Sequence, residues 1–179
     1  MPPILSAPYH LYAFKKDAPV ASLTLGKVLG HGGFCMVSVI TNLRVENDDL
    51  PDSCLKRKRE CRYVLKELHA NSQKDATGFV NGIADLAIEA RFLSVIKHPH
   101  IIKMRAMAST SPFSVDVPFF VVLDRLYDML EARTLKWKKK LAFIKLTDRH
   151  GVKERALWEK RMTVALDIAS ALQHLHSLK

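Results

Sequence analysis

Apolar and β-branched residues gather in two short segments near the start of the chain, residues 22–29 and 34–41. The four residues between these segments are Gly30, His31, Gly32 and Gly33. Strands favour β-branched residues and tight turns favour glycine, so this pattern predicts a hairpin. A third strand of the same character is expected at residues 62–68.

Residues 1–21 and 42–62 lack this pattern. The first segment holds four of the chain's eight prolines and is expected to be an irregular leader. The second contains an acidic run followed by a basic run, residues 56–59, and is expected to be a solvated loop.

The clearest helix lies in the middle of the chain. From Phe79 to Ile96, apolar residues recur at spacings of three and four, which predicts an amphipathic helix that ends before Pro99. Two strands are then expected at residues 101–108 and 117–126, on either side of a turn-forming cluster. A last helix, at residues 156–178, is apolar around most of its circumference, so it is expected to be buried on most sides.

Composition and charge narrow the class of protein. The 179 residues are 48% hydrophobic, the balance of a folded domain, and the net charge of +10 favours anionic partners such as nucleotides, nucleic acid or acidic membranes. The longest apolar run is too short to span a membrane, and the first residues do not resemble a secretory signal. Three cysteines without paired spacing favour reduced thiols. We therefore expect an intracellular, cytoplasmic protein. The alternative is a nuclear location, because the basic run at 56–59 resembles a short nuclear localisation patch.

Two charged residues occur where the expected elements present apolar neighbours. In the third strand, Lys66 alternates with Val64 and Leu68 and so lies on an apolar face. On the helix, Glu89 follows Leu86 by three residues and points to the buried side. A paired Lys and Glu costs much less than two isolated buried charges, so the sequence predicts an ion pair between them. The alternative is that Lys66 snorkels at a strand edge and Glu89 lies on a helix flank.

The glycine turn is a candidate phosphate site, because missing Cβ atoms let backbone N–H groups approach phosphate oxygens. Taken alone, the pattern also fits a hairpin without a ligand. The turn leads into a strand and no Gly-Lys-Ser/Thr occurs, so Walker-A and Rossmann sites are excluded. His98 and His100 flank a proline without further ligands nearby, so they favour a turn and no metal site is expected.

The order of these features resembles the amino-terminal lobe of a eukaryotic-type protein kinase. Residues 30–37 are similar to the family's GxGxxGxV loop, Val64-Leu65-Lys66 to its VAIK strand, and Glu89 to its helix C glutamate. Residues 98–103 look like the HPNI stretch after helix C. Residues 120–126 resemble the fifth strand and the hinge, and residues 165–179 resemble helix E.

This resemblance implies an α+β fold, with a five-stranded antiparallel sheet and helix C forming an amino-terminal lobe. That lobe with its hinge would occupy residues 22–126, and helices D and E of an incomplete carboxy-terminal lobe would occupy residues 127–179. It also implies ATP with Mg²⁺ as the cofactor and transfer of the γ-phosphate to Ser or Thr of a protein substrate, whose identity the sequence does not reveal.

The resemblance also assigns roles to individual residues. Lys66 would hold the phosphates and Glu89 would orient Lys66. Leu123 would be the gatekeeper next to adenine. The complete set of residues implied to contact ATP is Leu29, Gly30, His31, Gly32, Gly33, Phe34, Val37, Val64, Lys66, Leu123, Asp124 and Leu126.

Two departures from the family pattern matter. Cys35 replaces the third glycine of the loop, which we expect to stiffen the backbone and to leave a thiol open to oxidants near the phosphates. The 179 residues contain no HRD, catalytic-loop Asn, DFG or APE motif, and residues 148–150 are expected to be a surface turn. We therefore expect a kinase domain cut short before its catalytic loop and inactive by itself. The alternative is a non-catalytic, kinase-like binding module.

Residues 133–161 concentrate the positive charge, with 11 Lys and Arg against three acidic residues. The stretch 136–140 interleaves lysines with Trp137, a pattern that would also serve to contact nucleic acid or anionic lipid. We instead expect a charged, solvated insertion between helices D and E, without a nucleic-acid partner.

Overall fold

The structure of the chain is a computed structural model, which divides into two compact units. Unit 1 consists of Met1–Lys97 and Ile102–Arg125, and unit 2 consists of His98–Ile101 and Leu126–Lys179. The structure describes residues 4–5, 9–11, 18–45, 55–56, 60–108, 111–113, 118–148 and 150–178.

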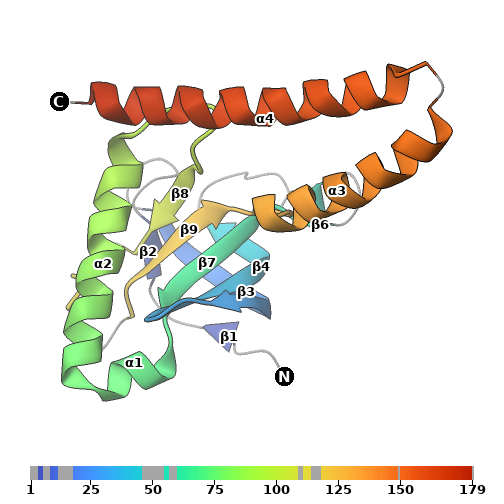
Figure 1. The fold of residues 1–179 in the computed structure, drawn as a ribbon. Coiled ribbons are helices and arrows are strands. Elements are labelled where there is room, and N and C mark those ends of the chain that lie inside the picture. The colour runs from blue at the N-terminus through green and yellow to red at the C-terminus, as the bar shows by residue number, and fades with distance from the viewer. Residues whose placement is uncertain are drawn as a thin grey trace. The chain divides into compact units, whose positions relative to one another are not determined.

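The five predicted strands form the body of the sheet in unit 1 (Figure 1). They are β3 (Ala18–His31), β4 (Cys35–Val45), β7 (Tyr63–Leu68), β9 (Phe120–Asp124) and β8 (Met104–Met107), in that spatial order. Each neighbouring pair is antiparallel. The predicted α+β fold is therefore confirmed, although β8 and β9 are shorter than expected.

Four short strands occur where the sequence predicts irregular chain. β1 (Ile4–Leu5) and β2 (Tyr9–Leu11) pair with β3, and β5 (Leu55–Lys56) pairs with β6 (Glu60–Cys61). The irregular leader and the solvated loop thus differ from the structure at these residues. The physical reason is that a short strand takes its hydrogen bonds from a partner, which local composition does not report. The rest of the basic run, residues 57–59, lies outside the described residues.

Helix α2 (Ala76–Val95) covers the predicted helix and begins three residues earlier than Phe79. The side chain of Asp75 caps its first turn, accepting a hydrogen bond from the Gly78 amide at 2.7 Å. A short helix, α1 (Ala70–Lys74), precedes it and was not predicted. One side of α2 is buried with the sheet residues in a single core, to which it contributes Ile83, Leu86 and Ala90.

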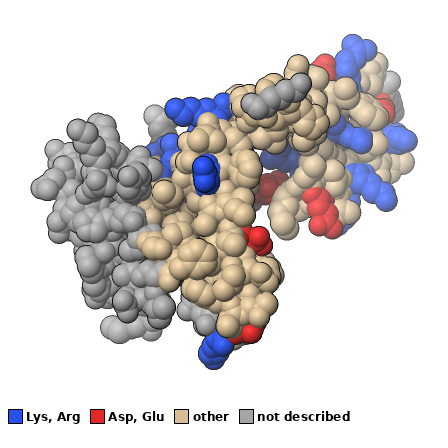
Figure 2. Space-filling view, turned by 90° about the vertical axis from the view of Figure 1, so that its left-hand side faces the viewer, with Lys and Arg blue, Asp and Glu red and all other residues tan. Residues whose placement is uncertain are grey.

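The outer side of α2 is apolar as well. Val80, Ile88, Phe92 and Val95 are all at least half exposed. Figure 2 turns this side of the molecule toward the viewer, and most of the described atoms near its centre are uncharged.

Unit 2 contains two long helices, α3 (Leu130–Thr147) and α4 (Val152–Ser177). Of the predicted turn at residues 148–150, Arg149 lies outside the described residues. On either side of it, the Asp148 carboxylate accepts hydrogen bonds from the amides of Lys153 and Glu154, and Gly151 adopts a left-handed φ of 68°. The basic segment 133–161 is largely exposed, as expected, but the expected insertion between helices is wrong, because most of the segment belongs to α3 and α4 themselves. Lysine, arginine, leucine and alanine all favour the helical conformation. In this segment that preference outweighs the repulsion between the lysine and arginine charges.

Helix α4 is less buried than its apolar circumference predicts. In the described part of unit 2, Leu157 is its buried residue, whereas Trp158, Met162 and Leu172 are about half exposed. None of the helices in the described residues is long and apolar enough to cross a membrane.

Candidate functional site

Strand register gathers the predicted site residues on one face of the sheet. Gly30 lies opposite Val37, and Val37 lies opposite Lys66 in the next strand. A neighbouring row places Val64 opposite Leu123. Cross-strand partners point to the same face, so residues far apart in the sequence form one surface.

The ion pair between Lys66 and Glu89 is present. The Lys66 ammonium donates a hydrogen bond to Oε2 of Glu89. The two side chains are 24% and 36% exposed, so the pair is partly shielded from water yet open on one side. This contact excludes the alternative in which Lys66 only snorkels at a strand edge.

A cavity of about 470 Å³ lies beside this pair within unit 1. The glycine turn forms one wall, and α2 forms another. Its lining residues are Gly30, His31, Gly32, Gly33, Phe34, Cys35, Val37, Lys66, Asp85, Leu86 and Glu89. Eight of these were predicted as site residues from the sequence.

The remaining predicted residues do not line this cavity. Leu29 is 40% exposed and does not line the cavity, while Val64 and Leu123 are buried in the sheet core. Asp124 ends β9, where both carboxylate oxygens accept hydrogen bonds from Arg105 at 2.8 Å. Leu126 is exposed and belongs to unit 2.

The glycine turn has open space beside two of its glycines. Gly32 donates a backbone hydrogen bond to the Cys35 carbonyl at 2.7 Å, which closes the turn. A Cβ atom added to Gly30 or Gly33 would meet no atom within 4 Å other than those of the residues next to it in the chain. The turn therefore offers room for phosphate oxygens next to a lysine ammonium, which suits the nucleotide implied by the sequence.

Cys35 does not present the exposed thiol that the sequence suggests. Its side chain is buried, with 8% of the residue exposed. Burial raises the pKa of the Cys35 thiol, and the nearby Lys66 cation opposes this shift. The expectation of an oxidant-accessible thiol at Cys35 is therefore wrong, because the reactive form of cysteine is the thiolate and burial disfavours it.

Asp85 and Leu86 line the cavity although the sequence did not single them out as site residues. Both precede Glu89 on α2, by four and three residues, so helical spacing places them on the same side. That spacing was the available signal. No pattern in the sequence indicated that α2 approaches the glycine turn.

The comparison with known families agrees with this geometry. The family described as protein tyrosine and serine/threonine kinase matches residues 23–179. The chain belongs to this family. No curated protein matches the chain in sequence. The kinase resemblance predicted from the motif order is thus confirmed, and so is the lobe built from a five-stranded antiparallel sheet followed by helices.

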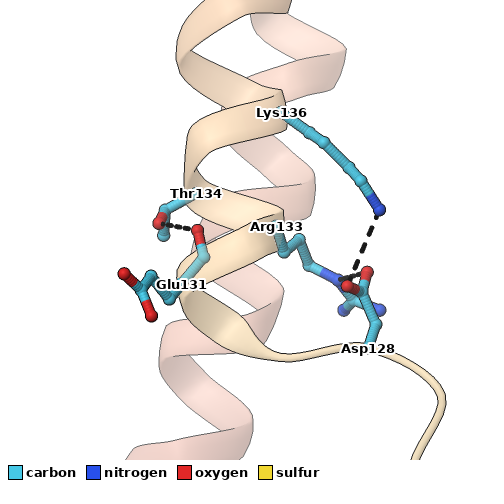
Figure 3. A network of polar contacts seen from close by, with 5 residues as sticks. All are labelled: Asp128, Glu131, Arg133, Thr134 and Lys136. Atoms are coloured by element: carbon cyan, nitrogen blue, oxygen red, sulfur yellow. Dashed lines mark hydrogen bonds and ion pairs between the residues drawn. The ribbon is translucent and has the colours of Figure 1, made fainter.

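In this kinase chain, part of the basic segment is already engaged within unit 2. Asp128 pairs with Arg133 at 3.3 Å and with Lys136 at 3.7 Å, at the start of α3 (Figure 3). The Arg161 guanidinium stacks over Trp158, 4.3 Å from the ring centroid. Trp137 lines a groove of about 550 Å³ together with residues of both helices. The interleaved tryptophan is therefore turned toward a neighbouring helix.

The predicted turn at His98 is also present, in unit 2. The Nε2 atom of His98 lies 3.2 Å from the Ser170 hydroxyl, and the His98 ring stacks on the His174 ring with 5.1 Å between centroids. Among the described residues, no three His, Cys, Asp or Glu side chains are grouped to hold a metal ion.

Proposed function

We propose that unit 1 of this kinase chain binds ATP with Mg²⁺ in the cavity beside the glycine turn. The observation that carries the proposal is the Lys66–Glu89 pair within a cavity walled by residues 30–33. Lys66 would hold the phosphates, Glu89 would orient Lys66, and the backbone of the turn would cover the nucleotide. ATP, when bound, supplies the transferable γ-phosphoryl group.

The adenine contacts of Leu29, Val37, Val64, Leu123, Asp124 and Leu126 are part of the same proposal. Support for Val64 and Leu123 comes from their opposing positions on the face that carries Lys66. The bidentate contact from Arg105 supports Asp124, because it holds the end of β9 in place.

We further propose that the 179-residue polypeptide transfers no phosphate by itself. The usual mechanism needs a base aspartate and Mg²⁺ ligands, and the sequence contains neither HRD nor DFG. Joined to those motifs, the domain would phosphorylate Ser or Thr of a protein substrate inside the cell. The choice of Ser and Thr is supported by the sequence resemblance alone. A polypeptide that binds ATP without turnover would act as a kinase-like binding module.

Isothermal titration of the 179-residue chain with ATP and Mg²⁺ tests this proposal. Lys66→Met removes the ammonium while keeping a long side chain, and we expect it to weaken binding at least about tenfold. Lys103→Met removes the same charge from an exposed position of unit 1 and should leave the affinity unchanged. Equal affinities for all three proteins would show that the cavity is not the nucleotide site.

A further inference from the structure

Gly82 lies buried in the middle of α2, at a point where the helix meets Phe34, the residue that directly follows the glycine turn. A Cβ atom at this position would lie 2.8 Å from Cβ of Phe34 and 3.2 Å from its Cγ. It would also lie 3.4 Å from a methyl group of Leu68. The contact with Phe34 is thus closer than any side chain larger than hydrogen allows.

The turn that carries Phe34 is held from a second direction. The Phe34 carbonyl accepts a hydrogen bond from the His69 amide at 3.0 Å, just after β7. His69 is itself fixed, because its Nδ1 accepts hydrogen bonds from the amides of Asn71 and Ser72 in α1. The backbone contact at His69 and the close approach at Gly82 together place Phe34.

One side of α2 then carries three parts of the site. Gly82 receives the turn, Leu86 walls the cavity, and Glu89 binds Lys66. Their spacing of four and three residues is that of neighbours on a helix face. The helix therefore fixes the distance from the turn to Lys66 through its own rigid geometry.

We propose that Gly82 is a positioning residue for the nucleotide's phosphates. Its missing side chain sets how closely the glycine turn approaches α2, and so how far the turn lies from Lys66. This inference rests on the proposed ATP site, and it adds a determinant that the kinase motifs do not include. Glycine is otherwise disfavoured inside a helix, so its presence here needs a reason of this kind.

The test compares ATP with adenosine as ligands of the full 179-residue chain carrying Gly82→Ala. To bring the new Cβ to 3.4 Å from Cβ of Phe34, Phe34 and α2 must separate by roughly 0.6 Å or more. A displacement of this size that costs one hydrogen bond to a charged phosphate oxygen is expected to weaken ATP binding about tenfold. Adenosine lacks phosphates, so its affinity should stay unchanged. Unfolding of the variant would instead weaken the binding of both ATP and adenosine.

Three companion measurements make the result specific. Asn81→Ala changes the adjacent, exposed position of α2 and should leave both affinities unchanged. In the Phe34→Gly background, Gly82→Ala should have no further effect on ATP, because the atoms it displaces are gone. Amide exchange of His69 should accelerate in Gly82→Ala as the contact with Phe34 loosens.

The outcomes separate this inference from the proposed function. If the wild-type chain binds ATP and Gly82→Ala leaves the ratio of ATP to adenosine affinity unchanged, the positioning role is overturned and the ATP site stands. If the wild-type chain does not bind ATP, the proposed function fails and the positioning role fails with it.

Discussion

The Lys66–Glu89 pair should stabilise unit 1 as well as bind nucleotide. We consider Lys66→Met, Glu89→Gln and the double variant, each of which removes charge while keeping side-chain length. Each single change leaves a partly buried charge without its partner, whereas the double change removes both charges. The double variant should therefore lose less stability than the two single losses together.

The exposure of the two side chains sets the size of this coupling. Fully exposed pairs contribute about 0–1 kcal/mol, and breaking a fully buried pair costs about 3–5 kcal/mol. At 24% and 36% exposure, the pair lies between these limits. We expect a coupling free energy of about 1–2 kcal/mol.

The assay must report on unit 1. Both tryptophans of the chain, Trp137 and Trp158, lie in unit 2, so tryptophan fluorescence follows the wrong unit. Amide hydrogen exchange of Leu65 and Val121 in the sheet core measures the free energy of opening where it matters. Lys103→Met, which changes an exposed lysine of the same unit, is the control and should have no effect.

Additive losses from the two single changes would refute this reasoning. Distant sites add to within roughly 0.3–0.5 kcal/mol, so a coupling below that range means that the pair contributes no mutual stabilisation.

Three further predictions follow from individual groups. Asp75→Ala removes the acceptor of the Gly78 amide at the start of α2 and should cost about 1 kcal/mol in urea unfolding followed by circular dichroism, whereas Asp75→Asn should restore most of it. Because burial raises the pKa of the Cys35 thiol, iodoacetamide should label it far more slowly in the native protein than in urea, as read by mass spectrometry; equal rates would contradict its burial. Partial burial and neighbouring histidines lower the pKa of His98, so the folded state binds fewer protons there than the unfolded chain, and stability is lost as the pH falls below about 6.5. Tryptophan-monitored unfolding of unit 2 should show a smaller loss in His98→Asn than in the wild type, and an equal loss would argue against this titration.

Local periodicity explains why much of unit 1 could be predicted. The strand at Lys66 and the helix at Glu89 each have a regular apolar pattern, and both charged residues interrupt it on the buried side. The requirement that such charges be paired then predicts a contact across 23 residues of sequence, which the structure contains.

Features that depend on tertiary contacts were not predictable in this way. β1 and β2 become strands through pairing with β3, and the pattern around them carries no strand signal. The close contact between Phe34 and Gly82 depends on how α2 packs against the sheet. A glycine within a helical pattern does not indicate which residue will approach it. Cys35 stands in a glycine-loop motif, yet packing buries its thiol.

In the basic segment, by contrast, a sequence pattern led to a wrong prediction. A high density of lysine and arginine suggested a solvated insertion, but helix propensity and the apolar residues between the charges favour α3 and α4. Charge alone did not distinguish an insertion between helices from the charged face of a helix.

An NMR titration of the ¹⁵N-labelled 179-residue chain with ATP and Mg²⁺ would show directly whether the cavity of unit 1 binds the nucleotide. We expect amide shifts concentrated at the glycine turn, Gly30, Gly32 and Gly33, and at Val37 and Lys66, with loss of these shifts in Lys66→Met. Shifts confined to the basic helices at residues 133–161, or no shifts at all, would contradict nucleotide binding in this cavity.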